Sequence, residues 1–233
     1  MRSLMRYLLR RIYNRVFPEV AFPHNSYAIQ SYSQNGEDLI LDAIFSCKES
    51  GVYVDIGAND PVGLNNTKRF YDRGWRGINI EPNPHKFVQF TKKRIEDINL
   101  NIGVSDITGI LPFYSIDLDT LSTFDKGAAI RHCRERGAHI VETLEIPVNR
   151  LEDIFAKYLG EKNIDFISID VEGAEMNVLR SNNWKKYRPR AIIIEITDNT
   201  QDILTFMIKN NYLSVMRNAE NGLFIDATKI KLE

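Results

Sequence analysis

Four acidic residues near the ends of two apolar segments are the strongest chemical signal in the sequence. Asp170 ends the segment FISID, Glu172 and Glu175 follow in the next turn, and Glu195 closes the segment AIIIE. Carboxylates that crowd together either raise one another's pKa, which produces a general base, or coordinate a hard divalent cation such as Mg²⁺ or Mn²⁺. A third interpretation is structural, with Glu172 or Glu175 capping the next helix.

A second cluster lies earlier, in the stretch YVDIGANDPVG at residues 53–63. A dinucleotide-binding loop needs several glycines whose backbone N–H groups close on a pyrophosphate. This loop has one early glycine, Gly57, and then Asn59 and Asp60, whose carboxylate would repel phosphate. Glu81, in NIEPNP, is placed to accept hydrogen bonds from ribose hydroxyls. A nucleoside cofactor with a positive charge and no phosphate fits this pattern, and S-adenosylmethionine is such a cofactor.

Alternating apolar and amphipathic segments must position these residues. The expected strands are 52–58, 77–82, 100–105, 165–173 and 190–197, and the expected helices are 32–45 with Asn35 as N-cap, 66–74 and 84–94. Such alternation is typical of a parallel, doubly wound α/β sheet. The turn sequence AENG between 212–218 and 222–228 predicts an antiparallel pair at the end of the sheet. Ligands bind beyond the carboxyl ends of parallel strands, so Asp55, Glu81, Asp170 and Glu195 should face one cleft.

The composition limits the remaining possibilities. A chain of 233 residues with 43% hydrophobic content suits one compact domain. Lys and Arg (30) nearly balance Asp and Glu (31), which argues against a general nucleic-acid binder. Two cysteines make neither a disulfide framework nor a metal motif, and no signal peptide or membrane-spanning run is evident. We therefore expect a cytoplasmic protein.

The first 26 residues form a separate segment in this interpretation, and residues 27–233 form the main domain. Leu4, Leu8, Ile12 and Val16 make one helical stripe among arginines, which predicts a basic amphipathic helix. Such a helix packs on the domain or on a second subunit, or it attaches peripherally to anionic lipid. The sequence leaves these alternatives open.

Five blocks in order resemble one known family. They are YSQNGEDLIL, VDIGANDPVGLNNTKRFYDRGWRGINIEPNP, IPVNRLEDIF, IDFISIDVEGAEMNVLR and RPRAIIIEI, within about residues 30–200. The chain resembles FkbM-type S-adenosylmethionine-dependent methyltransferases. The resemblance implies a class I, Rossmann-like methyltransferase fold: a mostly parallel seven-stranded sheet with an antiparallel last strand. It also implies O-methylation of a hydroxyl on a sugar, a polyketide or a similar natural product.

The segment at about 115–145 interrupts the alternation, and we interpret it as an insertion that overhangs the site as an acceptor lid. Its basic cluster suits the diphosphate of a nucleotide-sugar acceptor, or else it is a solvated helix face. The cluster consists of Arg131, His132, Arg134, Arg136 and His139. Either histidine is an alternative to the carboxylates as the base.

These observations assign the following roles. The predicted catalytic residues are Asp170, Glu195, Glu172 and His132, and Asp170 with Glu195 would hold Mg²⁺ or Mn²⁺ if a metal takes part. The predicted cofactor-binding residues are Gln34, Asp38, Asp55, Gly57, Asn59, Thr67, Glu81, Ser105 and Asp106. The expected acceptor is a nucleotide-linked sugar or a polysaccharide precursor, as in capsular polysaccharide biosynthesis. A polyketide acceptor, a nucleotide-dependent Rossmann-like enzyme and a non-catalytic partner-binding module are the alternatives.

Overall fold

One compact unit spans Ser31–Glu233 in a computed structural model that describes residues 29–196, 200–218 and 220–230. The predicted N-terminal helix, within residues 1–26, lies outside the described residues. Among the described residues, no helix has the length and apolarity needed to cross a bilayer. Cys47 and Cys133 are both free thiols.

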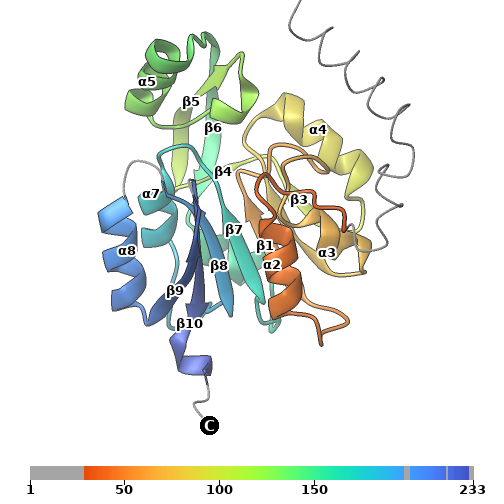
Figure 1. The fold of residues 1–233 in the computed structure, drawn as a ribbon. Helices are drawn as coiled ribbons and strands as arrows, with labels where there is room; N and C mark the ends of the chain where they lie inside the picture. Colours follow the sequence, from red (N-terminus) through yellow and green to blue (C-terminus); the bar gives the residue numbers. More distant parts are fainter. Residues whose placement is uncertain (1–28, 197–199, 219, 231–233) are drawn as a thin grey trace, which may run out of the picture. The chain divides into compact units, whose positions relative to one another are not determined.

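A seven-stranded sheet organises this unit (Figure 1). Its strands follow the order β3 (Ile98–Leu100), β2 (Arg76–Ile80), β1 (Val52–Ile56), β7 (Phe166–Ile169), β8 (Ala191–Glu195), β10 (Asn221–Asp226) and β9 (Tyr212–Arg217). Every neighbouring pair is parallel except the two that involve β10, which is antiparallel to both β8 and β9. The predicted doubly wound sheet and its C-terminal antiparallel pair are both confirmed.

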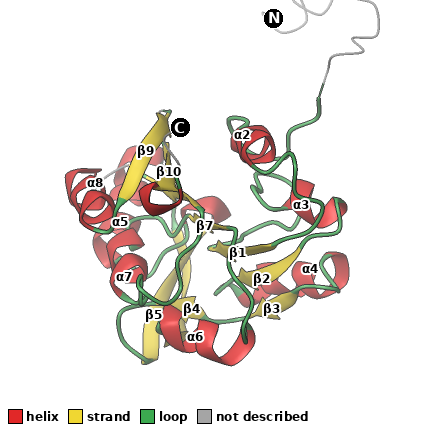
Figure 2. Cartoon of the chain, turned by 90° about the horizontal axis from the view of Figure 1, so that it is seen from below, coloured by secondary structure: helices red, strands yellow, loops and turns green. Residues whose placement is uncertain are grey.

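Helices lie on both sides of this sheet (Figure 2). Side chains from α2 (Glu37–Ile44) and α3 (Lys68–Asp72) pack on one face, together with Trp75. The opposite face is covered by α6 (Leu151–Tyr158), α7 (Glu175–Arg180) and α8 (Thr200–Lys209). Strands β7 and β8 are buried along almost their whole length, which explains why their sequences are apolar at consecutive positions rather than at alternate ones.

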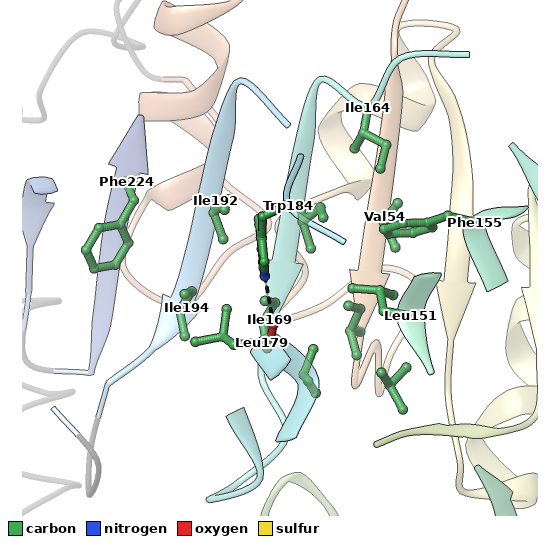
Figure 3. Close-up of a cluster of buried hydrophobic side chains, with 14 of the residues drawn as sticks. Val54, Leu151, Phe155, Ile164, Ile169, Leu179, Trp184, Ile192, Ile194 and Phe224 are labelled. Atoms are coloured by element: carbon green, nitrogen blue, oxygen red, sulfur yellow. Dashed lines mark hydrogen bonds between the residues drawn. The ribbon is translucent and has the colours of Figure 1, made fainter. Parts of the chain in front are cut away.

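The larger core lies between the sheet and α6, α7 and α8 (Figure 3). Val54, Ile169 and Ile192 from three neighbouring strands contact the apolar side chains of these helices. Burying an aliphatic side chain of this size stabilises the fold by about 1.5–3 kcal/mol. Trp184 closes the layer and satisfies its indole N–H by donating to the carbonyl of Leu179 at 2.7 Å. This rigid layer fixes the carboxyl ends of the central strands.

A separate three-stranded sheet, visible at one end of the main sheet in Figure 1, corrects one strand prediction. It has the order β4 (Gly103–Val104), β6 (Ile140–Asn149) and β5 (Gly109–Ile116). The predicted strand 100–105 is therefore wrong as a single element, because its two halves belong to β3 and β4 in different sheets. Asn101 redirects the chain between them by donating from Nδ2 to the carbonyls of Glu81 and Pro82, both at 2.9 Å.

The segment interpreted as a lid contains the end of β5, the 3-10 helix η2 (Asp119–Leu121), α5 (Lys126–Arg136) and the first half of β6. Asp125 is the N-cap of α5 and accepts from the Ala128 N–H at 2.7 Å, and Gly137 ends the helix in the left-handed conformation. A second 3-10 helix, η3 (Ala227–Lys229), follows β10.

The starts of helices α4 (Pro84–Lys93) and α2 lie near the carboxyl edge of the sheet. Helix α4 starts at the predicted position, and Asn83 caps it through the His85 N–H at 2.9 Å. Helix α2 differs from the prediction, because its N-cap is Gly36 rather than Asn35. Gly36 has a φ of 85°, and the Asn35 N–H instead donates to Glu37 at 2.9 Å. The Asn35 side chain therefore does not cap the helix, and the Glu37 carboxylate instead ties down the backbone just before it.

Candidate active site

A cavity of about 860 Å³ lies at the carboxyl ends of β1, β2, β7 and β8 and reaches η2 and α5. Of the predicted site residues, those that line it are Gln34, Gly57, Asn59, Glu81, His132, Asp170, Glu172 and Glu195. Those that do not line it are Asp38, Asp55, Thr67, Ser105 and Asp106. The predicted carboxyl-end cleft is therefore present, with part of the predicted set on its wall and part behind it.

Gly57 forms the sharp turn after β1. Its φ is +77°, and the N–H groups of Gly57 and Ala58 both donate to the carbonyl of Ile80, at 3.0 and 3.1 Å. A Cβ atom at Gly57 would lie 1.7 Å from the carbonyl oxygen of Asp170. Two strand ends therefore approach so closely here that only glycine fits.

Glu81 fixes the next part of the loop. Its two carboxylate oxygens accept from the backbone N–H groups of Asn59 and Asn83, each at 2.7 Å. Asn59 has a φ of 48°, a conformation that asparagine tolerates better than most residues. Burial raises the pKa of Glu81 to about 7, and the two N–H donors oppose that shift. Each oxygen keeps a lone pair that could accept from a hydroxyl in the cavity.

Asp60, the acidic residue that follows this turn, has a structural role. Its Oδ1 accepts from the N–H groups of Val62 and Gly63, at 2.8 and 2.9 Å, so it closes a local turn. Asp60 also lines the cavity, where its charge disfavours a pyrophosphate. A buried arginine supports the same loop from below, because Arg94 donates to the carbonyl of Pro61 at 2.9 Å.

Asp55 and Thr67, predicted to touch the cofactor, lie behind this loop. Asp55 accepts from Thr67 Oγ1 at 2.9 Å and from Asn65 Nδ2 at 3.1 Å. Arg94 joins them through Asn65 Oδ1 at 2.8 Å. Burial raises the pKa of Asp55 to about 6, with the Thr67 hydroxyl acting in the opposite direction. The contacts of these residues hold the loop that carries Asn59.

The remaining predicted cofactor residues are also mainly structural in their contacts. Asp38 is fully buried and accepts from the hydroxyls of Ser31 and Ser33, at 2.6 and 2.8 Å. Ser105 is buried and lies 3.3 Å from Asp106, immediately after the cavity-lining strand β4. Their identification as cofactor residues stays a prediction.

The acidic group is brought together as predicted. Asp170, Glu172 and Glu195 each offer a carboxylate oxygen, and these oxygens lie within 4.8 Å of one another. The pKa of each is raised, first by removal from water and then by repulsion among neighbouring carboxylates. Glu195 Oε2 is buried, and no hydrogen-bond partner for it is found in the described part of the chain. Desolvation and mutual repulsion therefore both favour proton uptake by the group, and the charge that remains suits a cationic ligand.

The turn after β7 places two of its acids differently. Glu172 has a φ of 53° and lines the cavity, where its Oε2 lies 3.4 Å from His132 Nε2 of α5. Glu175 is buried and accepts from the Gly173 N–H at 3.0 Å, so it stabilises the start of α7. The structural interpretation thus holds for Glu175, whereas Glu172 belongs to the cavity.

The basic cluster of α5 divides in the same way. Arg131, His132 and Arg136 line the cavity. Arg134 instead pairs with Glu135 at 2.8 Å, and the exposed His139 lies 3.3 Å from Asp117. Neither Arg134 nor His139 is part of the cavity wall. The geometry brings two arginines and one histidine of the predicted five to the site.

Several lining residues were absent from the sequence interpretation, among them the charged residues Lys86 and Glu220. Lys86 of α4 reaches across to η2 and forms an ion pair with Asp119. Glu220 comes from the turn between β9 and β10 and adds a further carboxylate beside Glu195. Lys86 could have been suspected from its position one turn after NIEPNP, whereas nothing local in AENG indicates that Glu220 turns toward the strand ends.

The chain was compared with known protein families and with solved structures. Residues 55–214 match the family model described as the methyltransferase FkbM domain. No curated protein matches the chain.

Solved structures with a similar arrangement are distant in sequence. One is a TehB-like SAM-dependent methyltransferase from Corynebacterium glutamicum, with 10% identity, a TM-score of 0.44, and coverage of 93% of this chain and 97% of that chain. Another is a Burkholderia thailandensis 1,6-didemethyltoxoflavin-N1-methyltransferase with bound 1,6-didemethyltoxoflavin and S-adenosylhomocysteine, with 9% identity, a TM-score of 0.43, and coverage of 95% and 88%. At such low identities and TM-scores, neither bears on the substrate or the mechanism.

Proposed function

Because the chain belongs to the FkbM methyltransferase family, we propose that it transfers a methyl group from S-adenosylmethionine to a hydroxyl of a sugar. The expected acceptor is a nucleotide-linked sugar or a polysaccharide precursor. The observation that carries this proposal is the convergence of three carboxylates within 4.8 Å in a cavity that Glu81 and Gly57 also line.

The cavity fits the methyl donor chemically. Glu81 offers carboxylate lone pairs to the ribose hydroxyls, and Gly57 and Asn59 shape the turn beside it. The crowded carboxylates favour a positively charged ligand, and the Asp60 carboxylate disfavours a phosphorylated one. When bound, S-adenosylmethionine supplies an electrophilic methyl group on a sulfonium. The protein must then orient an acceptor hydroxyl, exclude water and remove its proton.

The acidic group is suited to removing that proton. Asp170 faces the open cavity, and its raised pKa lies close to the working range of a general base. Glu195 and Glu172 surround it and can share the proton taken up. A divalent cation held by Asp170 and Glu195 is the alternative agent, and chelation separates the two, as discussed below. His132, 3.4 Å from Glu172, is the next candidate.

Arg131 and Arg136 support an acceptor with an anionic part. Both line the cavity from α5, and Arg136 opposes the rise in the pKa of Glu172, so its charge acts on the acidic group. Arginine binds phosphate through paired, charge-assisted hydrogen bonds. An acceptor with a hydroxylated end and a diphosphate end would place the first at the carboxylates and the second at these arginines.

Replacing Glu81 tests the ribose contact. Glu81→Gln should weaken binding of S-adenosylhomocysteine by about 2 kcal/mol, roughly 30-fold, because a charge-assisted hydrogen bond is lost. The wild-type affinity should fall as pH drops below about 7, since the neutral carboxyl is a poorer acceptor, and be constant well above that value. Titration calorimetry from pH 5.5 to 8.5 measures both effects. If Glu81→Gln binds S-adenosylhomocysteine at pH 8 as tightly as the wild type does, Glu81 does not contact the ribose.

Replacing the cavity-lining arginines tests the anionic part of the acceptor. Arg131→Ala and Arg136→Ala should each raise the acceptor KM about tenfold and leave the affinity for S-adenosylhomocysteine unchanged. Arg134→Ala is the matched control, because Arg134 is an arginine of the same helix that does not line the cavity. If the acceptor KM of all three variants equals that of the wild type, the arginines do not bind the acceptor, and the alternative interpretation of a solvated helix face holds.

The function itself is tested with methyl-tritiated S-adenosylmethionine. Nucleotide-diphosphate hexoses, polysaccharide precursors and polyketide hydroxyls are offered as acceptors, and label in a product identifies the class. Label transferred to polyketides alone would support the alternative acceptor. Thermal stabilisation by NAD(P) but not by S-adenosylhomocysteine would contradict methyl transfer and favour a nucleotide-dependent enzyme.

A further inference from the structure

The turn between β9 and β10 brings an acidic residue to the cavity from far along the chain. Glu220 lines the cavity immediately before Asn221, the residue that pairs with Glu195 across β10 and β8. The carbonyl of Glu220 also accepts the N–H of Ile196, so the turn is tied to the end of β8. Three strands, β7, β8 and β10, thus present Asp170, Glu195 and Glu220 along one edge.

A buried network positions this turn. Glu37, which is fully buried at the start of α2, accepts from the side-chain amides of Asn218 and Asn221, at 2.7 and 2.9 Å. Asn218 Oδ1 in turn accepts from the N–H groups of Glu220 and Asn221, at 3.0 and 2.6 Å. Both sides of the turn are therefore anchored, and the position of Glu220 is set by specific contacts rather than by chance exposure.

Gln34 orients the carboxylate itself. Its Nε2 donates to Glu220 Oε2, and both residues line the cavity. The sequence analysis predicts Gln34 to bind the cofactor. This contact gives Gln34 a second interpretation, as a residue that orients the Glu220 carboxylate. Among the described residues, none donates a hydrogen bond to the other oxygen, Oε1, which can therefore accept from a ligand.

The strand order separates Glu220 from Glu81, the predicted ribose contact, although Gln34, another predicted cofactor residue, contacts Glu220. Strand β10 lies three positions from β1 and four from β2. At about 4.8 Å per strand, these separations are roughly 14 and 19 Å. With a nucleoside held by Glu81 at the end of β2, Glu220 lies beyond the strands that carry Asp170 and Glu195, on the side that we assign to the acceptor.

We propose that Glu220 contacts the methyl acceptor and selects one that presents neighbouring hydroxyl groups at the acidic end of the cavity. This inference rests on the proposed function, since it needs an acceptor beside Asp170. A carboxylate accepts hydrogen bonds from two adjacent hydroxyls of a sugar ring, and it repels an anionic group. The phosphate of any nucleotide-linked acceptor is thereby directed toward Arg131 and Arg136 instead.

The test uses simple methyl glycosides, so the natural acceptor need not be known. Methyl α-D-glucopyranoside, methyl α-D-galactopyranoside and methyl α-L-rhamnopyranoside are titrated by NMR into the full-length chain saturated with S-adenosylhomocysteine. At least one should bind, and Glu220→Gln should weaken that binding at least fivefold while the affinity for S-adenosylhomocysteine stays within twofold. Glu161→Gln, an exposed carboxylate away from the cavity, is the matched control and should change neither value.

Gln34→Ala gives an independent readout. It should weaken glycoside binding in the same direction, and the double variant with Glu220→Gln should be no weaker than Glu220→Gln alone, because the two residues act as a unit. Thermal denaturation verifies that each variant is folded. The inference is overturned if no glycoside binds the wild type, or if the bound glycoside binds Glu220→Gln equally well. Absence of S-adenosylhomocysteine binding to the wild type would instead contradict the proposed function.

Discussion

Gly57→Ala is expected to abolish measurable binding of S-adenosylhomocysteine, a loss of at least about 100-fold. Two effects combine at this position. A residue with a Cβ pays about 1–2 kcal/mol in the left-handed region, and the new atom would lie 1.7 Å from the carbonyl oxygen of Asp170. Since that oxygen belongs to the backbone, the ends of β1 and β7 must move apart, which displaces Asn59 and Asp170 together. Titration calorimetry gives the affinity and thermal denaturation gives the stability.

Gly74→Ala is the matched control for this prediction. Gly74 also has a positive φ, +91°, but a Cβ there meets no atom within 4 Å, and Gly74 does not line the cavity. The control should lose about 1 kcal/mol of stability and keep its affinity for S-adenosylhomocysteine. If Gly57→Ala binds S-adenosylhomocysteine as tightly as Gly74→Ala does, the close approach of the two strand ends does not shape the cofactor site.

The sheet could be predicted from the sequence because its strands carry a continuous apolar signal. FISI and AIIIE are buried on both faces, and the periodic segments between strands have the length of crossover helices. The same logic gives the cavity its position, since parallel strands end at one edge. The sequence alone therefore predicts that Asp170, Glu195 and Glu81 border one cleft.

Contacts made by side chains across long sequence distances could not be predicted. Asp55 has the sequence position of a cofactor residue, yet it bonds to Thr67 because the loop folds back over it. Glu220 enters the cavity only because Glu37, 183 residues earlier, anchors the turn through Asn218. A polar side chain at a strand end can therefore either line the cavity or form hydrogen bonds within the loops that surround the cavity. Hydropathy does not distinguish them.

The proton-transfer chemistry at Asp170 gives the second large expected effect. Asp170→Asn keeps the shape of the side chain and removes its charge, so it should lower kcat by at least about 100-fold, the usual range for a lost general base. The affinity for S-adenosylhomocysteine should stay within a few-fold, because Asp170 follows β7 rather than β1 or β2. Asp202→Asn, an exposed aspartate of α8 away from the cavity, should retain wild-type turnover. Initial rates of methyl transfer measure kcat.

The pH dependence and a chelator identify what the carboxylate does. A base must be deprotonated. The side chain of Asp170 is exposed to the cavity, but desolvation at the strand end and the carboxylates of Glu175 and Asp55 raise its pKa. Wild-type kcat should therefore fall as pH drops through neutrality, and Asp170→Asn should lose that acidic limb. If a cation acts instead, EDTA should abolish wild-type turnover, and Mg²⁺ or Mn²⁺ should restore it, with Asp170→Asn and Glu195→Gln both needing more metal. Wild-type turnover in Asp170→Asn, with and without EDTA, would contradict both roles and make His132 the residue to replace next, because it lines the cavity and lies 3.4 Å from Glu172.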